Sequence, residues 1–117
     1  MRIAVASEGL EVAPVFGRCS SLTCYRVERG VIVECQNTPA NPLLSASHLA
    51  SLMRELDVRV LIAGTIERDA AEALRAADIE VIPNKDGTAR HAAEDYLAHT
   101  LIGADEADEE EIGVMEA

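Results

Sequence analysis

The residues best suited to chemistry are thiols, arginines and Gly-Thr pairs in short segments between apolar runs. Arg18-Cys19 places a guanidinium directly beside a thiol, which favours the thiolate, the form that attacks electrophiles or ligates metals. Gly64-Thr65 and Gly87-Thr88 each join a glycine, which lets the backbone come close to a ligand, to a threonine that can cap a helix. These pairs could cradle an anion, although ordinary capping is the alternative.

Arg90 and His91 follow the second Gly-Thr pair, in the first turn of an expected helix. The helix dipole there keeps an imidazole neutral, as metal ligation requires. We therefore predict Cys19 and His91 as metal ligands, with Arg18 and Arg90 as countercharges; a simple helix-boundary role for His91 is left open.

The other two cysteines fall within expected strands. Strand parity places Cys24 with Leu22, and Cys35 with Val31 and Val33, so both are expected to be core thiols.

The elements that must position these residues alternate between strands and helices. Strands are expected over 2–6, 21–28, 31–37, 58–63 and 79–82, and helices over 45–57, 67–77 and 88–101, the last ending near residue 103. This βββαβαβα order predicts an α/β fold with a five-stranded mixed sheet, in which the hairpin forms the antiparallel side. The remaining segments, including 9–20 and 37–42, are expected to be loops.

The carboxyl ends of parallel strands are where open α/β sheets bind ligands. In this chain that rule selects the segment from Ser7 onward, the pair Gly64-Thr65 and residues 84–88. We expect these three segments to converge at one edge of the sheet.

Composition limits the classes of partner. The chain has 117 residues, enough for one domain over 1–103, and a net charge of -11, which argues against nucleic acid. Residues 104–117 hold seven acidic residues and no Lys or Arg, and are expected to be a disordered acidic tail. With no membrane-spanning or secretory segment and an odd number of cysteines, we expect a cytoplasmic protein without structural disulfides.

Four segments of the sequence resemble one known family: residues 3–7 (IAVAS), 16–19 (FGRC), 60–64 (VLIAG) and 87–90 (GTAR). The chain resembles the dinitrogenase iron-molybdenum cofactor biosynthesis family, which includes nitrogenase accessory proteins and the orange protein. The likeness covers about residues 1–101 and implies a ribonuclease H-like fold and a non-catalytic binding or carrier role for metal-sulfur clusters. Family members often have a histidine where this chain has Val15, which removes one candidate ligand.

Three functions follow from these observations. The first is a carrier of an iron-sulfur, iron-molybdenum or molybdenum-sulfide cluster that exchanges it with donor and acceptor proteins, alone or as a homodimer. The second is a metal-free protein-interaction module, and the third is a thiol enzyme that uses Cys19. For the first function the candidate binding residues are Ser7, Phe16, Gly17, Arg18, Cys19, Gly64, Thr65, Gly87, Thr88 and Arg90.

Overall fold

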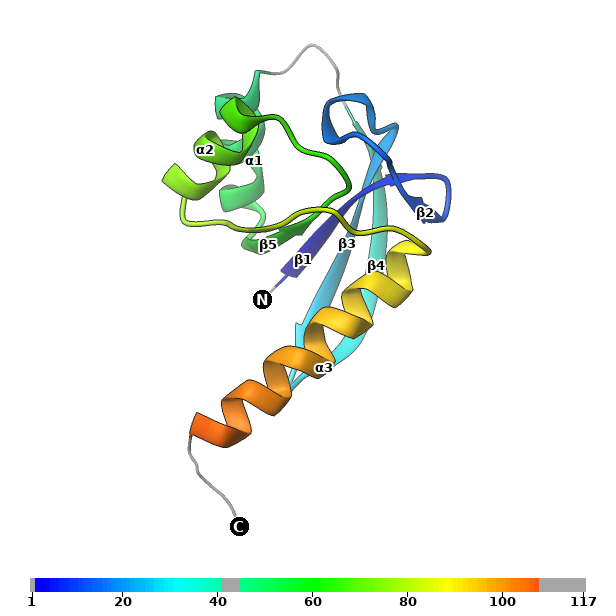
Figure 1. Cartoon of the computed structure of the whole chain (residues 1–117), viewed down its shortest axis with the longest axis vertical. Coiled ribbons are helices and arrows are strands. Elements are labelled where there is room, and N and C mark those ends of the chain that lie inside the picture. Colours follow the sequence, from blue (N-terminus) through cyan, green and yellow to red (C-terminus); the bar gives the residue numbers. More distant parts are fainter. Residues whose placement is uncertain (1, 41–44, 108–117) are drawn as a thin grey trace.

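One mixed sheet organises the chain. The computed structural model describes residues 2–40 and 45–107 (Figure 1). The strands are β1 (Arg2–Glu8), β2 (Glu11–Val12), β3 (Ser21–Glu28), β4 (Val31–Pro39), β5 (Val58–Ile62) and β6 (Glu80–Ile82). Their order across the sheet is β4-β3-β1-β5-β6, with the short β2 paired to β1. β1, β5 and β6 run parallel, whereas β3 and β4 form an antiparallel hairpin, so the predicted mixed sheet is confirmed.

β1 lies in the middle of the sheet and is buried on both faces. Its residues from Ile3 to Ala6 are fully covered, because helices pack on each side. Alternation sends Ala4 and Ala6 to one face and Ile3 and Val5 to the other. The central strand therefore separates two cores.

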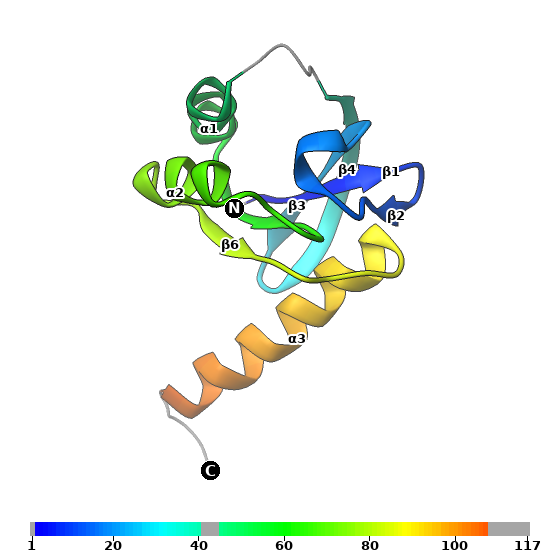
Figure 2. The ribbon, with the colours of Figure 1, turned by 45° about the horizontal axis from the view of Figure 1, so that its top comes forward.

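Two helices cover one face and a third covers the other. α1 (Ala46–Glu55) and α2 (Arg68–Ala76) bury Met53 and Leu74 against the face of Ala4 and Ala6. α3 (Ala89–Ala107) lies on the opposite face (Figures 1 and 2) and buries Ala89, Ala92, Ala93 and Leu97 there. No helix among the described residues is both long and apolar enough to cross a membrane.

Helix ends follow local capping chemistry. The Ser45 side chain accepts a hydrogen bond from the backbone N–H of His48 at the start of α1. α1 and α2 are followed by Asp57 and Asp78, whose positive φ values of 61° and 64° place them in the left-handed region that ends helices.

The structure corrects several predicted boundaries. The segment 9–20, predicted as loop, contains β2 and a 3-10 helix, η1 (Phe16–Arg18), because its backbone pairs with neighbouring segments. β1 extends through Glu8, and β4 runs to Pro39 because an edge strand tolerates proline. α3 continues past Gly103 to Ala107. The remainder of the predicted tail, 108–117, lies outside the described residues.

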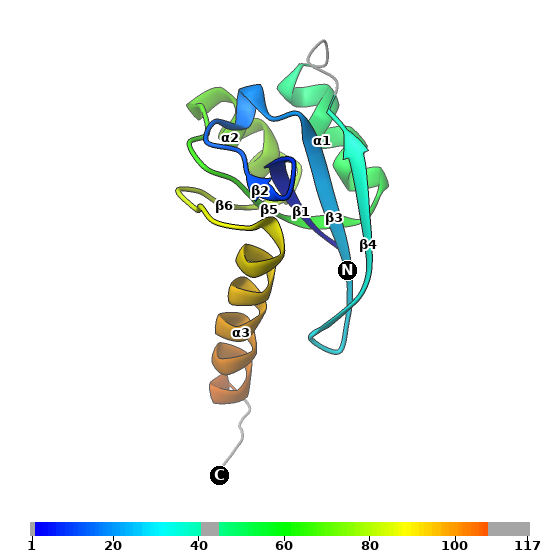
Figure 3. The ribbon, with the colours of Figure 1, turned by 90° about the vertical axis from the view of Figure 1, so that its right-hand side faces the viewer.

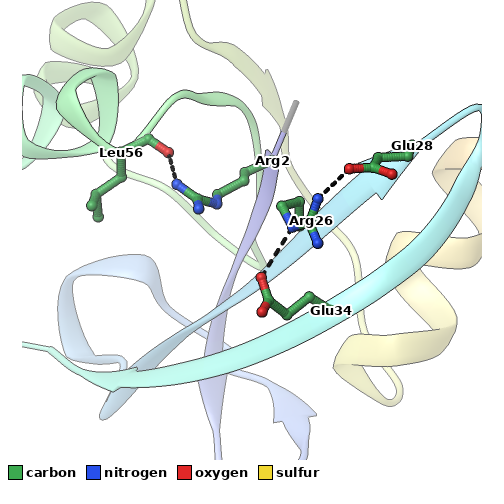
Figure 4. A network of polar contacts seen from close by, with 5 residues as sticks. All are labelled: Arg2, Arg26, Glu28, Glu34 and Leu56. Carbon is green, nitrogen blue, oxygen red and sulfur yellow. Dashed lines mark hydrogen bonds and ion pairs between the residues drawn. The ribbon is translucent and has the colours of Figure 1, made fainter.

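Ion pairs occupy the face of the hairpin that is turned away from α3. Arg26 pairs with Glu28 and with Glu34, the latter over 3.0 Å, and Arg2 donates a hydrogen bond to the carbonyl of Leu56 over 2.6 Å (Figure 4). These groups are exposed, so each pair contributes little to stability.

Candidate functional site

The loop after β1 reaches the loop before α3. The N–H of Ala89 donates to the carbonyl of Leu10, and the N–H of Val12 donates to the carbonyl of Gly87, each over 2.9 Å. Gly87 adopts a φ of 82°, a conformation suited to glycine, where the chain turns into α3.

The same loop also binds the segment after β5. The backbone N–H of Phe16 donates to the carbonyl of Thr65 over 2.7 Å, and the N–H of Thr65 donates to the carbonyl of Pro14 over 2.8 Å. Gly64 accepts a hydrogen bond from Asn84 over 2.9 Å. The three segments therefore do converge at the carboxyl edge of the parallel strands.

The two Gly-Thr pairs have different roles. Thr88 accepts a hydrogen bond from the N–H of His91 over 3.1 Å and so caps α3, which is the alternative role that the sequence left open. Thr65 does not cap α2, whose N-cap is Glu67. Because its N–H is already bonded to Pro14, that amide is not free to bind an anion.

A hollow of about 800 Å³ lies between the start of α3 and the hairpin. In Figure 3, β4 lies at the edge of the sheet, apart from α3. The residues that line it come from the loop after β1, from β3 and β4, and from the first residues of α3: Gly9, Leu10, Ser20, Ser21, Thr23, Tyr25, Cys35, Asn37, Pro39, Thr88, Ala89 and Arg90. Its size suits a small-molecule or cluster ligand.

A network of hydroxyl groups forms the floor of the hollow. Ser7 is fully buried, and its Oγ lies 2.8 Å from both Ser21 Oγ and Thr23 Oγ1. Asn37 donates from Nδ2 to Thr23 over 2.9 Å and to Ser21 over 3.2 Å. Ser7 therefore supports the floor, whereas Ser21 and Thr23 line the hollow directly.

Arg90 is the one charged residue among those that line the hollow. Its Nε lies 3.2 Å from a carboxylate oxygen of Glu94, one helical turn along α3. That pair offsets part of the guanidinium charge, while the terminal nitrogens are not engaged by it. The predicted partner Arg18 does not line the hollow and belongs to η1.

The Phe16–Cys19 loop lies on the other side of the sheet. Phe16 is buried in the core beneath α1 and α2, and Cys19 packs against the same core. Burial raises the pKa of the Cys19 thiol, although a backbone hydrogen bond partly offsets this. The raised pKa therefore gives no support to the prediction that Arg18 favours a Cys19 thiolate.

The predicted metal pair comes from elements on opposite faces. Cys19 contacts the core beneath α1 and α2, whereas His91 belongs to α3 and is exposed. In the described part of the chain, no group of three or more His, Cys, Asp or Glu residues could hold a metal ion. Joint ligation of one ion by Cys19 and His91 finds no support in this arrangement.

The contribution of β3 and β4 to the hollow was not predicted from the sequence. Cys24 is half-buried against the core beneath α1 and α2, but Cys35 is exposed, so its assignment as a core thiol is wrong. No residue of β4 is buried, because no helix covers this edge strand. The register pairs Cys35 with Tyr25 and Asn37 with Thr23. The polar residues Thr23 and Asn37 on this face were the sequence signal that a helix does not cover it fully.

Cysteine reactivity should follow burial. With iodoacetamide at neutral pH, we expect Cys35 to be alkylated before Cys19 and Cys24, because burial raises the pKa of both other thiols. Mass spectrometry of peptides from timed samples measures the order. In urea, where all three thiols are exposed, the difference should vanish. Faster alkylation of Cys19 in the folded protein would contradict this account and favour a thiol enzyme.

The fold and the hollow together define an α/β domain with one mixed sheet and a candidate site at the carboxyl edge of its parallel strands. The model of the dinitrogenase iron-molybdenum cofactor family matches residues 1–99, and the chain belongs to that family. This confirms the resemblance seen in the sequence. A search of the curated proteins found no match.

Solved structures share the fold. The apo form of the orange protein from Desulfovibrio gigas is 27% identical, with a TM-score of 0.65, and the match covers 87% of this chain and 88% of that one. A protein from Thermotoga proposed to be a NifB protein is 26% identical, with a TM-score of 0.65 and coverage of 84% and 87%. A proposed dinitrogenase from Methanocaldococcus jannaschii has a TM-score of 0.69 at 14% identity, covering 85% and 89%.

Proposed function

We propose that this protein is a non-catalytic, cytoplasmic carrier that binds a metal-sulfur cluster, or a precursor of one, in the hollow between α3 and the hairpin. The cargo would be of iron-sulfur, iron-molybdenum or molybdenum-sulfide type, received from and delivered to other proteins. The observation that carries the proposal is the hollow itself, which opens at the edge where the three loops converge. Family membership supplies the chemical class of the cargo. The proposal includes the ribonuclease H-like fold type that the resemblance implied.

The lining of the hollow fits such a cargo. Sulfide clusters present a polarisable, anionic surface that accepts hydrogen bonds weakly, so a wall with few strong polar groups suits them. The Thr23 hydroxyl, which accepts a hydrogen bond from Asn37, can donate its own proton, and Arg90 and the N-terminal end of α3 offset negative charge. A stable iron-sulfur cluster normally takes four thiolates, and this hollow offers one, so the cargo would be held loosely. Loose binding suits a carrier that must release its cargo.

The ten predicted binding residues divide into two groups in this proposal. Thr88 and Arg90 line the hollow, Gly87 sets the turn before them, and Ser7 supports its floor. The remaining residues shape the convergent loops from the other side of the sheet: Phe16, Gly17, Arg18, Cys19, Gly64 and Thr65.

Blocking the hollow tests the proposal. Ser20 is exposed at its rim, so Ser20→Trp should obstruct the hollow without disturbing the core, whereas Ser51→Trp places the same ring on the exposed surface of α1. After anaerobic reconstitution with iron, sulfide and tetrathiomolybdate, wild type and Ser51→Trp should retain metal and colour through gel filtration. Ser20→Trp should retain little of either. Equal uptake by all three proteins would place any cluster elsewhere.

A metal-free interaction module is the second candidate, and the edge of the sheet favours it. Val31 and Val33 on β4 are 61% and 47% exposed, and exposed apolar residues on an edge strand often mark a protein contact. A module of this kind would take up no metal in the reconstitution, which separates it from the carrier.

A further inference from the structure

The hairpin side of the hollow holds two cross-strand pairs on one face. The register sets Thr23 opposite Asn37 and, two residues along, Tyr25 opposite Cys35. All four line the hollow. The two pairs therefore form a continuous surface, here named the hairpin wall, that carries a hydroxyl, an amide, a phenol and a thiol.

The inner part of the hairpin wall is built from buried polar groups. Thr23 and the adjacent Ser21 are each only 7% exposed, yet both line the hollow. Asn37 donates to both hydroxyls, and those hydroxyl protons can rotate between partners in the floor and a ligand above it. Such a donor array is fixed in place before a ligand arrives, which favours binding.

The outer part of the wall is accessible because β4 is an uncovered edge strand. Cys35 is exposed and lines the hollow beside Tyr25, whereas Cys19 and Cys24 are half-buried against the opposite core. Cys35 lies opposite the aromatic ring of Tyr25, and the amide of Asn37 lies two residues along the same strand face. This combination suits a soft metal ion that carries sulfide ligands.

We propose that the hairpin wall is the attachment surface for the cargo, with Cys35 Sγ bound to a soft metal ion of the cargo and the Thr23 hydroxyl, oriented by Asn37, donating a hydrogen bond to one of its sulfides. The inference rests on the proposed function and names the attachment residue within it. On binding, Cys35 releases its thiol proton to water, and its sulfur lone pair forms the metal bond in place of a labile ligand such as water. No electron is transferred.

A soft metal ion alone tests the thiol. Under anaerobic conditions, one equivalent of Cu(I) is added in the presence of glutathione as competitor, and copper is counted after gel filtration. Wild type, Cys19→Ser and Cys24→Ser should retain copper, and Cys35→Ser should not. Retention by Cys35→Ser equal to that of wild type overturns the inference, as does failure of wild type to retain copper.

The donor array is tested in the same assay. Asn37→Ala should weaken copper or tetrathiomolybdate retention about tenfold, the size expected when a group supporting a metal ligand is lost. Gln36→Ala is the matched control, because Gln36 is exposed on the same strand and points to the other face. Equal effects of the two substitutions would contradict a role for Asn37.

Reconstitution with iron, sulfide and tetrathiomolybdate separates this inference from the carrier function. If wild type and Cys35→Ser take up the same cluster, the carrier function stands and the attachment through Cys35 is wrong. If wild type retains Cu(I) through Cys35 but takes up no cluster, the thiol site stands and the proposed cargo is wrong.

Discussion

Gly64→Ala is expected to lower the free energy of unfolding by about 3 kcal/mol. We expect this to be the largest loss for an alanine substitution at any glycine of the convergent loops. A Cβ at Gly64 would lie 2.5 Å from the carbonyl oxygen of Pro14 and 2.6 Å from that of Ala13. These are backbone atoms of the loop that joins the three convergent segments, so they cannot move without breaking its hydrogen bonds to Thr65. Urea unfolding followed by circular dichroism measures the change.

Gly17→Ala is the matched control for this prediction. A Cβ at Gly17 would approach only the carboxylate of Glu67, at 2.9 Å, and that exposed side chain can rotate away. We expect a loss below about 1 kcal/mol. Similar losses at the two glycines would show that the close approach of the loop at Gly64 is not what makes a glycine necessary there.

Ser7→Ala is expected to cost about 2 kcal/mol, because it removes the shared partner of two buried hydroxyls. Ser21 and Thr23 each lie 2.8 Å from Ser7 Oγ and are only 7% exposed, so the lost hydrogen bonds are poorly replaced by water. The free energy of unfolding in urea provides the measurement.

Ser20→Ala is the control, since Ser20 is exposed and its hydroxyl makes only a long contact of 3.4 Å with the Ser7 carbonyl. Its loss should be below about 0.5 kcal/mol. If Ser7→Ala is as mild as Ser20→Ala, the hydroxyl floor does not stabilise the sheet. That result would also contradict a role for the hydroxyl network in shaping the hollow.

The sequence predicted the main elements because their apolar periods are strong. The runs at Ile3–Ala6 and Val58–Ile62 are rich in apolar residues, as is typical of buried parallel strands. In the structure both belong to parallel strands that are largely buried. β2 was missed because two residues give no periodic signal, and Glu11–Val12 becomes a strand only by pairing with β1. Ser7 was read as the end of a strand, although it remains paired and buried.

The convergence of the three segments was predicted from the sequence, whereas the residues that line the hollow were mostly not. The rule for carboxyl ends of parallel strands correctly selected the loops that converge, including Thr88 and Arg90. Strand parity tells which residues share a face, but not whether a helix covers that face. For that reason Cys35 was assigned to a core, and the packing of Cys19 beneath α1 and α2 could not be foreseen.

The most direct test of the account is the position of the metal in a crystal of the reconstituted protein, from anomalous scattering at the metal absorption edges. We predict an anomalous peak inside the hollow, bounded by Tyr25, Asn37 and Arg90. A peak beside Cys19 on the opposite side of the sheet, or crystals of treated protein with no anomalous peak, would contradict the claim that this hollow holds the cargo.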